Sequence, residues 1–207
     1  MKKIIRYIAG QFGKPAGFGG RLSTFVMNCL NQKMYRSVEK NLQIKETDIL
    51  LDIGFGNGYL LRRLSKQNPQ KLYGVEISKD MIKAVGQKNK VLIQQEKMKL
   101  WEADVENMPF EESSIDKAYT INTIYFWQDL DRGFFEINRI LKSGGIFLNV
   151  LYVKEWLDKL PVTQYGFSKY DVEQITEAAA KSGLKIEDVF EIQPEKSVCI
   201  IARKEQK

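Results

Sequence analysis

The chain has no histidine among its 207 residues. Histidine supplies the commonest general base at neutral pH and many of the ligands of transition metals in proteins. Its absence excludes the Ser-His-Asp and Cys-His arrangements of nucleophilic catalysis and most transition-metal sites. We therefore expect no metal site, and we assign no catalytic residue from the sequence.

Cysteine is nearly as scarce as histidine. Cys29 and Cys199 are far apart in the sequence and lie in no C-x-x-C pattern. With no histidine to join them, they match neither a zinc site nor the framework of a disulfide-rich protein. The sequence predicts that both are small buried hydrophobic side chains.

Long hydrophobic runs are also missing. Although 43% of the residues are hydrophobic, no apolar stretch approaches the roughly eighteen residues of a membrane-spanning helix. Arg6 interrupts the apolar part of the N-terminus and no small-residue cleavage site follows, which argues against a signal peptide. Because repeats and low-complexity segments are absent too, we expect one compact structural domain, located in the cytoplasm.

Glycines at alternate positions are the most informative feature that is present. Gly54, Gly56 and Gly58 follow an apolar run over Ile49–Ile53 that contains the acid Asp52. The pattern predicts a buried strand that turns into a helix. Closely spaced glycines let the backbone turn sharply and leave no side chain between it and a ligand, while the next helix directs its amides at that space. We expect a flat, polar ligand to bind there.

A second acid, Glu76, ends a short apolar strand predicted over residues 71–77. An acid at this position binds ribose hydroxyls in doubly wound nucleotide-binding folds. Their dinucleotide fingerprint is G-x-G-x-x-G, and here Tyr59 stands where its third glycine belongs. The missing glycine argues against a nicotinamide-dependent oxidoreductase.

From about residue 45 to residue 205 the chain resembles the class I S-adenosylmethionine-dependent methyltransferases. Within them it is most similar to the small-molecule type that includes the ubiquinone and menaquinone biosynthesis enzymes. The matches occur in the family's order: the glycine loop of residues 52–58, Glu76, Asp104 within Ala103-Asp104-Val105, Pro109-Phe110, and residues 139–145. The resemblance implies an α/β fold with a doubly wound, Rossmann-like sheet of seven strands, mostly parallel with an antiparallel last strand. It also implies S-adenosylmethionine as the cofactor.

The resemblance assigns roles to these motifs. In that family the glycine loop holds the amino acid end of the cofactor, the acid matching Glu76 holds the ribose, and the acid matching Asp104 faces the adenine amino group. Ile77 or Met81 is implied to press on the adenine ring. An ordinary helix cap is the alternative role for Asp104. The cofactor-binding residues implied by the resemblance are Asp52, Gly54, Phe55, Gly56, Gly58, Glu76, Ile77, Met81, Asp104, Val105 and Asn122.

The acceptor side is expected after the strand predicted over Ile115–Ile121. The next residues, 122–127, line cofactor and substrate in the quinone-type relatives. Asn122-x-x-Tyr125 is similar to the Asn-Pro-Pro-Tyr loop of amino-group methyltransferases but lacks both prolines, so we do not infer nucleobase methylation. Packing of these aromatic residues against the following helix is the alternative. The candidates for contact with the acceptor are Asn28, Tyr125, Trp127, Trp156 and Tyr165.

Further along the chain, Asp129 and Asp131 are predicted to cap a helix that ends at residues 142–145, where a glycine can take the left-handed cap conformation. The fifth strand is predicted over residues 146–153. The family places a variable, substrate-covering segment where residues 154–167 lie, and the aromatic residues there favour an apolar or aromatic acceptor.

The last helix and two strands are also predicted from local patterns. Ser168 and Asp171 have the spacing of a capping box. Residues 186–192 and 197–203 are predicted to form a hairpin.

Basic charge is concentrated near the N-terminus. Residues 1–40 hold eight Lys or Arg and one acid, whereas the remainder holds 24 basic and 25 acidic residues. Residues 1–44 are predicted to be a helical arm or lid, in which Asn28 and Asn31 either reach the pocket or lie on the surface, and residues 45–207 the cofactor-binding domain. Residues 1–12 have an amphipathic pattern, which fits weak contact with a membrane surface, packing over the site, or a solvated helix face.

The sequence therefore predicts a methyltransferase that acts on a small acceptor, either lipophilic or aromatic. Methyl transfer needs no histidine, because the sulfonium donor is already activated and in-line displacement depends mainly on positioning and desolvation. One alternative is an RNA methyltransferase, which the sequence pI of about 9.1 favours, although no RNA-binding module is recognisable and a nucleic-acid partner is not expected. The other is a non-catalytic protein that binds S-adenosylmethionine.

Overall fold

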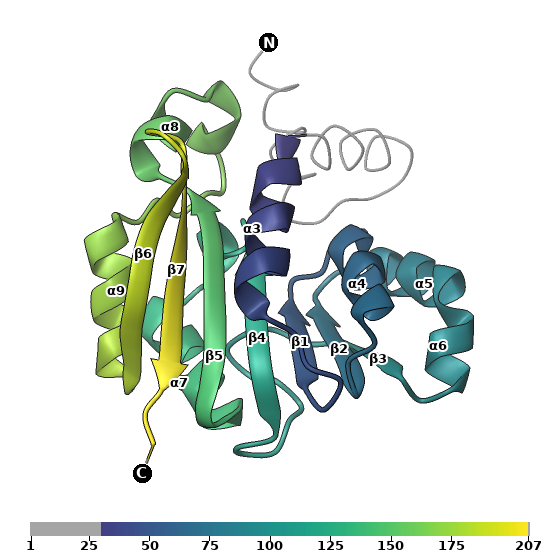
Figure 1. The fold of residues 1–207 in the computed structure, drawn as a ribbon. Coiled ribbons are helices and arrows are strands. Elements are labelled where there is room, and N and C mark those ends of the chain that lie inside the picture. The colour runs from purple at the N-terminus through teal and green to yellow at the C-terminus, as the bar shows by residue number, and fades with distance from the viewer. Residues whose placement is uncertain (1–29, 207) are drawn as a thin grey trace.

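The computed structural model describes residues 30–206 (Figure 1). These residues form a seven-stranded sheet in the order β3-β2-β1-β4-β5-β7-β6. Neighbouring strands are parallel from β3 to β5, whereas β7 is antiparallel to both β5 and β6. The strands are β1 (Ile49–Ile53), β2 (Lys71–Glu76), β3 (Met98–Glu102), β4 (Ile115–Ile121), β5 (Leu141–Tyr152), β6 (Leu184–Gln193) and β7 (Ser197–Lys204). The predicted sheet and its C-terminal hairpin are confirmed.

Helices cover both faces of this sheet. One cluster of buried side chains joins α7 and α9 to one face, and another joins α3 and α4 to the opposite face, where Figure 1 shows α3 in front of the strands. The α-helices are α3 (Gln32–Leu42), α4 (Tyr59–Leu64), α5 (Lys79–Lys88), α6 (Lys90–Gln94), α7 (Leu130–Ile140), α8 (Lys154–Asp158) and α9 (Val172–Lys181). Three short 3₁₀ turns are η1 (Ser65–Gln67), η2 (Ile124–Phe126) and η3 (Pro161–Gln164). None of the helices within residues 30–206 has the length and hydropathy needed to cross a membrane.

The central strands fix where a ligand can bind. In β1 the four residues after Ile49 are buried, as expected for a strand with parallel neighbours on both sides and helices on both faces. Ile53 pairs with Val75 of β2 and with Thr120 of β4, so the carboxyl ends of the three strands meet at one edge. The strand order reverses between β1 and β4, and a doubly wound sheet opens a crevice at such a point.

The junction between α7 and β5 differs from the prediction. The helix ends at Ile140, and β5 begins at Leu141 rather than at residue 146. Leu141 is extended and pairs with Ile115, after which the register shifts. Gly144 does take a left-handed φ of 75°, but it lies within this irregular start of the strand and not at a helix cap. Pairing with β4 therefore overrides the local helix-end signal.

The start of α9 also differs. The predicted capping pair of Ser168 and Asp171 is wrong by one turn, because Asp171 itself precedes the helix and its backbone N–H donates to Gln174 Oε1 at 2.9 Å. The Ser168 backbone N–H instead donates to the Tyr125 carbonyl oxygen at 2.9 Å. The predicted cap of α7 is confirmed, since Asp129 Oδ1 accepts from the Arg132 backbone N–H at 3.0 Å.

Helix α3 packs directly on the sheet. Its side chains Met34, Val38 and Leu42 are fully buried in the same cluster as Leu60 of α4 and Leu148 of β5. The described end of the predicted arm thus contributes to the core. The helices and the amphipathic pattern predicted within residues 1–29 lie outside the described residues.

The two cysteines can be compared with their prediction in part. Cys199 of β7 is fully buried, as predicted, and burial raises the pKa of its thiol to about 12. Such a thiol stays protonated and unreactive at neutral pH. Cys29 lies outside the described residues.

We expect the substitution Leu42→Ala to lower the free energy of unfolding by about 2–5 kcal/mol, because it removes a fully buried side chain and leaves a cavity under α3. Urea denaturation of the purified protein measures this change. Leu30→Ala is the control, since Leu30 is 55% exposed and its loss should cost no more than about 0.5 kcal/mol. Equal and small effects of the two substitutions would contradict the packing of α3 as part of the core.

Candidate functional site

Two clefts meet at the carboxyl ends of the central strands. The first is lined among others by Gly54, Gly56, Glu76, Ile77, Asp104, Val105 and Asn122. The second shares Gly54 and Gly56 with the first and adds Asp52 and Phe55. Nine of the predicted cofactor-binding residues therefore surround one crevice on either side of the glycine loop. Gly58 and Met81 line neither cleft.

The glycines of the loop serve different purposes. All three have left-handed φ angles, 75° for Gly54, 51° for Gly56 and 69° for Gly58. A Cβ atom at Gly54 would collide with the Thr123 side chain, and one at Gly58 would lie 2.7 Å from Val85 Cγ1. A Cβ atom at Gly56 would meet nothing within 4 Å. Gly54 and Gly58 thus allow close packing, whereas Gly56 borders open space into which a ligand can approach the backbone.

Glu76 is held rigidly at the end of β2. The residue is 7% exposed, and its carboxylate accepts three backbone hydrogen bonds, from Gly56 at 3.0 Å, Ile77 at 2.9 Å and Ser78 at 3.0 Å. Burial raises the pKa of Glu76, and the three N–H donors oppose that rise. Because Oε1 receives two of these bonds and Oε2 only one, Oε2 can still accept a hydroxyl from a ligand.

Asp52 lies on the other side of the glycine loop. It is 4% exposed, and the Tyr119 hydroxyl donates to its Oδ2 at 2.7 Å. Burial raises the pKa of Asp52 to about 8, the hydrogen bond from Tyr119 opposes the rise, and the charge of Glu76 adds to it. A cationic ligand group in the second cleft would favour the ionised carboxylate.

Asp104 lies in a turn after β3. Its Oδ1 accepts from the Glu106 backbone N–H at 3.1 Å, and its carbonyl oxygen accepts from the Asn107 N–H at 3.1 Å. No helix starts in this part of the described chain, so the alternative role as a helix cap is wrong. Asp104 and the buried Val105 instead form a wall of the first cleft.

Asn122 lines the first cleft and connects it to the start of α3. It has a left-handed φ of 58°, which asparagine tolerates better than most residues. Its Nδ2 donates to Asn31 Oδ1 at 3.3 Å, and its Oδ1 accepts from the Tyr125 hydroxyl at 3.1 Å and from the Tyr152 N–H at 3.2 Å. The Tyr152 hydroxyl also donates to Asn31 Oδ1, at 3.0 Å. A polar network therefore connects the exits of β4 and β5 to the start of α3.

The residues predicted to contact the acceptor are placed differently from one another. Trp127 lines the first cleft, and its Nε1 donates to Thr123 Oγ1 at 3.3 Å. Tyr125 is 2% exposed and packs against Phe126 and Phe167. Trp156, in α8, and Tyr165, after η3, line neither of these clefts, as is also true of Tyr125. Asn28 lies outside the described residues.

Two residues of the site were not predicted. Tyr35 of α3 and Tyr119 of β4 line the second cleft around Asp52. Thr123 and Phe126, which belong to the predicted segment of residues 122–127, line the first cleft. Tyr35 and Tyr119 have no motif of their own in the sequence. Their place beside Asp52 depends on how α3 and β4 pack against β1.

The crevice fits S-adenosylmethionine in its chemistry. Glu76 can accept the ribose hydroxyls, the open space at Gly56 admits a ligand beside the backbone, and the acid Asp52 matches the ammonium group of an amino acid end. The apolar side chains of Ile77 and Val105 border the part of the first cleft that also contains Asp104. An aromatic ring with an amino substituent suits such a wall.

Comparisons with known proteins identify a methyltransferase domain. Residues 51–149 match the model of the methyltransferase domain family. The uncharacterized methyltransferase YdaC of Bacillus subtilis is 27% identical over 185 residues, which cover 88% of this chain and 98% of that protein. The sterol 4-C-methyltransferase strm-1 of Caenorhabditis elegans is 31% identical over 146 residues, which cover 70% of this chain. They cover only 42% of the sterol enzyme, so the chain spans less than half of its length.

A solved structure supports the fold. The geranyl diphosphate C-methyltransferase of Streptomyces coelicolor, in complex with Mg²⁺, geranyl diphosphate and S-adenosyl-L-homocysteine, aligns with a TM-score of 0.72 at 16% identity. The alignment covers 84% of this chain and 77% of that one. Residues 51–149 thus carry a methyltransferase domain, and the described residues have the fold of the class I S-adenosylmethionine-dependent methyltransferases.

Proposed function

We propose that the protein transfers the methyl group of S-adenosylmethionine to a small lipophilic or aromatic acceptor. The observation that carries the proposal is the aromatic wall of the first cleft. Phe126 and Trp127 line the cleft that also contains Glu76 and Asp104. Behind Phe126, the ring of Phe167 lies 4.8 Å from it between centroids. Apolar aromatic walls of this kind bind apolar ligands by burying their surface.

A segment far away in the sequence packs against this wall. Phe126 belongs to η2, after β4, whereas Phe167 follows η3 in the predicted substrate-covering segment. Two of the related enzymes are named for acting on sterols and on geranyl diphosphate, which are lipophilic in whole or in part. The relatives and the aromatic wall thus support the same class of acceptor.

We assign the cofactor-binding roles as follows. Glu76 binds the ribose hydroxyls, Asp52 and the glycine loop bind the amino acid end, and Asp104 accepts from the adenine amino group. Ile77 and Val105 border the adenine ring. The bound cofactor supplies an activated methyl group, so the chain has to orient the acceptor and exclude water.

We assign no general base to this site, and Tyr125 is the residue to consider first. The Tyr125 hydroxyl lies within hydrogen-bond distance of Asn122 Oδ1, at 3.1 Å, and of the Tyr152 carbonyl oxygen, at 3.0 Å. Burial also raises the pKa of Tyr125 well above its ordinary value. This hydroxyl is thus a hydrogen-bonding group that fixes Asn122 and not a base. We infer that the acceptor loses its own proton to solvent or has none to lose.

Calorimetric titration with S-adenosylmethionine and with NAD tests the first half of the proposal. We expect saturable binding of S-adenosylmethionine and no binding of NAD, because Tyr59 replaces the glycine that a pyrophosphate-binding turn needs. If the protein bound NAD and not S-adenosylmethionine, the proposed cofactor would be wrong. The second half is tested by following release of S-adenosylhomocysteine with a panel of phenols, quinols and prenyl alcohols, and with total RNA. If S-adenosylhomocysteine were released with RNA and with none of the small molecules, the acceptor would be a macromolecule and the proposal of a small acceptor would be wrong.

A further inference from the structure

The loop between β3 and β4 is fastened to helix α7 at two separate places. This loop, residues 103–114, carries Asp104 and Val105 of the first cleft. Helix α7 is an eleven-residue helix whose side chains Phe134, Ile137 and Ile140 are fully buried or nearly so. The helix is therefore a rigid support for a loop that has no regular structure of its own.

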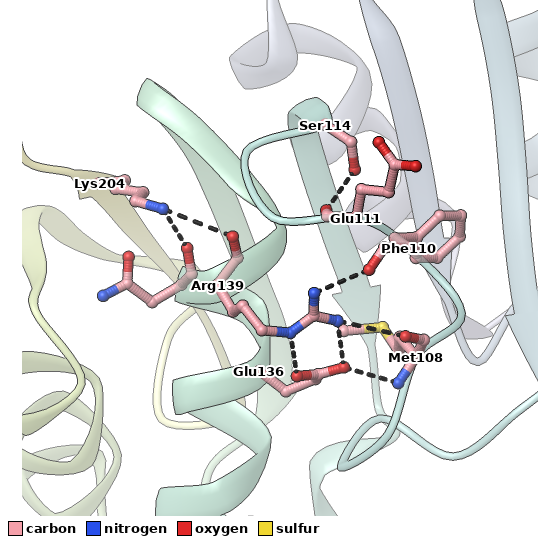
Figure 2. A network of polar contacts seen from close by, with 8 residues as sticks. Met108, Phe110, Glu111, Ser114, Glu136, Arg139 and Lys204 are labelled. Atoms are coloured by element: carbon pink, nitrogen blue, oxygen red, sulfur yellow. Dashed lines mark hydrogen bonds and ion pairs between the residues drawn. The ribbon is translucent and has the colours of Figure 1, made fainter.

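The first fastening is made by Arg139 and Glu136, as Figure 2 shows. The Arg139 guanidinium donates to both carboxylate oxygens of Glu136 at 2.7 Å. It also donates to the carbonyl oxygens of Phe110, at 2.7 Å, and of Met108, at 3.2 Å. Glu136 Oε1 in turn accepts from the Met108 N–H at 2.7 Å. We call these four residues the Arg139 clamp.

The clamp depends on the shape of arginine. A planar guanidinium presents several N–H donors in fixed directions, so it can bind a carboxylate and two carbonyl oxygens together, which a lysine ammonium does less well. Besides binding Arg139, the Glu136 carboxylate accepts a hydrogen bond directly from the loop, from the backbone N–H of Met108. Both backbone polar groups of Met108 are therefore bound by α7 side chains.

The second fastening is made by Glu106. Its Oε1 accepts from the backbone N–H groups of Gln128, at 2.8 Å, and Asp129, at 2.7 Å, directly before α7. The backbone N–H of Glu106 itself donates to Asp104 Oδ1 at 3.1 Å. The residue that binds the start of α7 thus also orients the Asp104 carboxylate.

A second arginine of this protein makes a similar clamp away from the two clefts. Arg203 of β7 donates to both carboxylate oxygens of Glu187, at 2.5 and 3.0 Å, and to the Gly144 carbonyl oxygen at 2.7 Å. Its chemistry matches that of the Arg139 clamp. Neither Arg203 nor its partners line the two clefts, so it provides a matched control.

We propose that Glu106, Glu136 and Arg139 are positioning residues that hold Asp104 where it can distinguish an amino-substituted purine from an oxo-substituted one. The proposal rests on the assignment of Asp104 to the adenine amino group. A site built to accept a hydrogen bond from an amino group rejects an analogue that presents an oxygen there, provided that the acceptor is held in place. Loosening the loop should therefore affect selectivity for the ring more than binding of the rest of the ligand.

The test compares dissociation constants for S-adenosylhomocysteine and S-inosylhomocysteine, in which an oxygen replaces the amino group. We expect the wild-type protein to prefer the adenosine compound at least about tenfold. Arg139→Gln should reduce this preference to about twofold or less and raise the dissociation constant for S-adenosylhomocysteine about tenfold. Arg139→Lys should fall between the two, and Arg203→Gln should leave both constants unchanged.

Each outcome has a defined meaning. If folded Arg139→Gln keeps the wild-type preference, or loses affinity for both ligands equally, the clamp is merely structural and the inference is wrong. If Arg139→Gln does not fold, Glu106→Ala replaces it, because the N–H groups that Glu106 binds are close to solvent and the same loss of preference is expected. If the wild-type protein binds neither ligand, the proposed cofactor site fails together with the inference.

Discussion

Replacing Glu76 with alanine should weaken the binding of S-adenosylmethionine by about 100-fold, or about 2.7 kcal/mol. The substitution removes the acceptor for the ribose hydroxyls, and hydrogen bonds to a charged group contribute roughly 1.5–3 kcal/mol each. It also leaves the N–H groups of Gly56, Ile77 and Ser78 without their common partner. Isothermal titration calorimetry on the free protein measures the change.

The neighbouring strand offers a matched control. Glu102 ends β3, pairs in register with Glu76, and has a side chain that is 52% exposed. Glu102→Ala removes the same charge from the same edge of the sheet and should change the affinity less than about twofold. Equal losses for Glu76→Ala and Glu102→Ala would mean that only the charge of the edge matters and that Glu76 does not contact the ribose.

The substitution Glu76→Gln should weaken the binding of S-adenosylmethionine nearly as much as Glu76→Ala does. The carboxylate of Glu76 accepts N–H groups with both of its oxygens. A glutamine amide has only one oxygen, so its NH₂ group would face at least one of these backbone donors. Near-normal binding by Glu76→Gln would contradict the geometry of the glycine loop described above.

The affinity for S-adenosylmethionine should rise with pH between about pH 6 and pH 7.5, by up to tenfold per pH unit. The pKa of Asp52 is raised to about 8 by burial, so about nine-tenths of the free protein has a protonated Asp52 at pH 7. The α-ammonium group at the amino acid end of the cofactor is cationic, and beside Asp52 it favours the ionised carboxylate. Binding must then release a proton, and lowering the pH opposes that release.

Calorimetry in two buffers with different ionisation enthalpies measures the released protons directly. We expect close to one proton per cofactor bound at pH 7 for the wild-type protein, and almost none for Asp52→Asn. The asparagine variant should also bind with an affinity that hardly changes over this range of pH. A wild-type affinity that is independent of pH would place the cationic end of the cofactor away from Asp52.

Local sequence patterns predicted the glycine loop and the two acids beside it, whereas the resemblance to a known family implied the other cofactor-binding residues. The apolar run, the alternating glycines and the acids Asp52 and Glu76 can each be recognised from residues that are close together in the sequence. A buried parallel strand needs a continuous apolar run, and a tight turn beside a ligand needs glycine. Parallel strands bring their carboxyl ends to one edge. The residues that follow β1, β2 and β3 could therefore be expected around one crevice from their order in the sequence.

Tertiary contacts decided the rest. Gly144 and Ser168 carry helix-end and helix-start signals, yet pairing of β5 with β4 and a hydrogen bond to Tyr125 determine where they lie. The second cleft also depends on Tyr35 of α3 and Tyr119 of β4, which are far apart in the sequence. Neither residue belongs to a recognisable sequence motif. Contacts between segments this distant leave no periodic signal in a single sequence.

The sequence by itself therefore determined the glycine loop and the two acids beside it, because these depend on spacing along one strand and one turn, and it indicated the class of fold through the resemblance to a known family. Only the tertiary structure decided which aromatic side chains face the cleft, how Asn31 and Asn122 meet, and how Arg139 holds the loop of Asp104. Their positions follow from the packing of helices on the sheet. That packing is set by the shapes of many side chains at once, and no short stretch of sequence contains it.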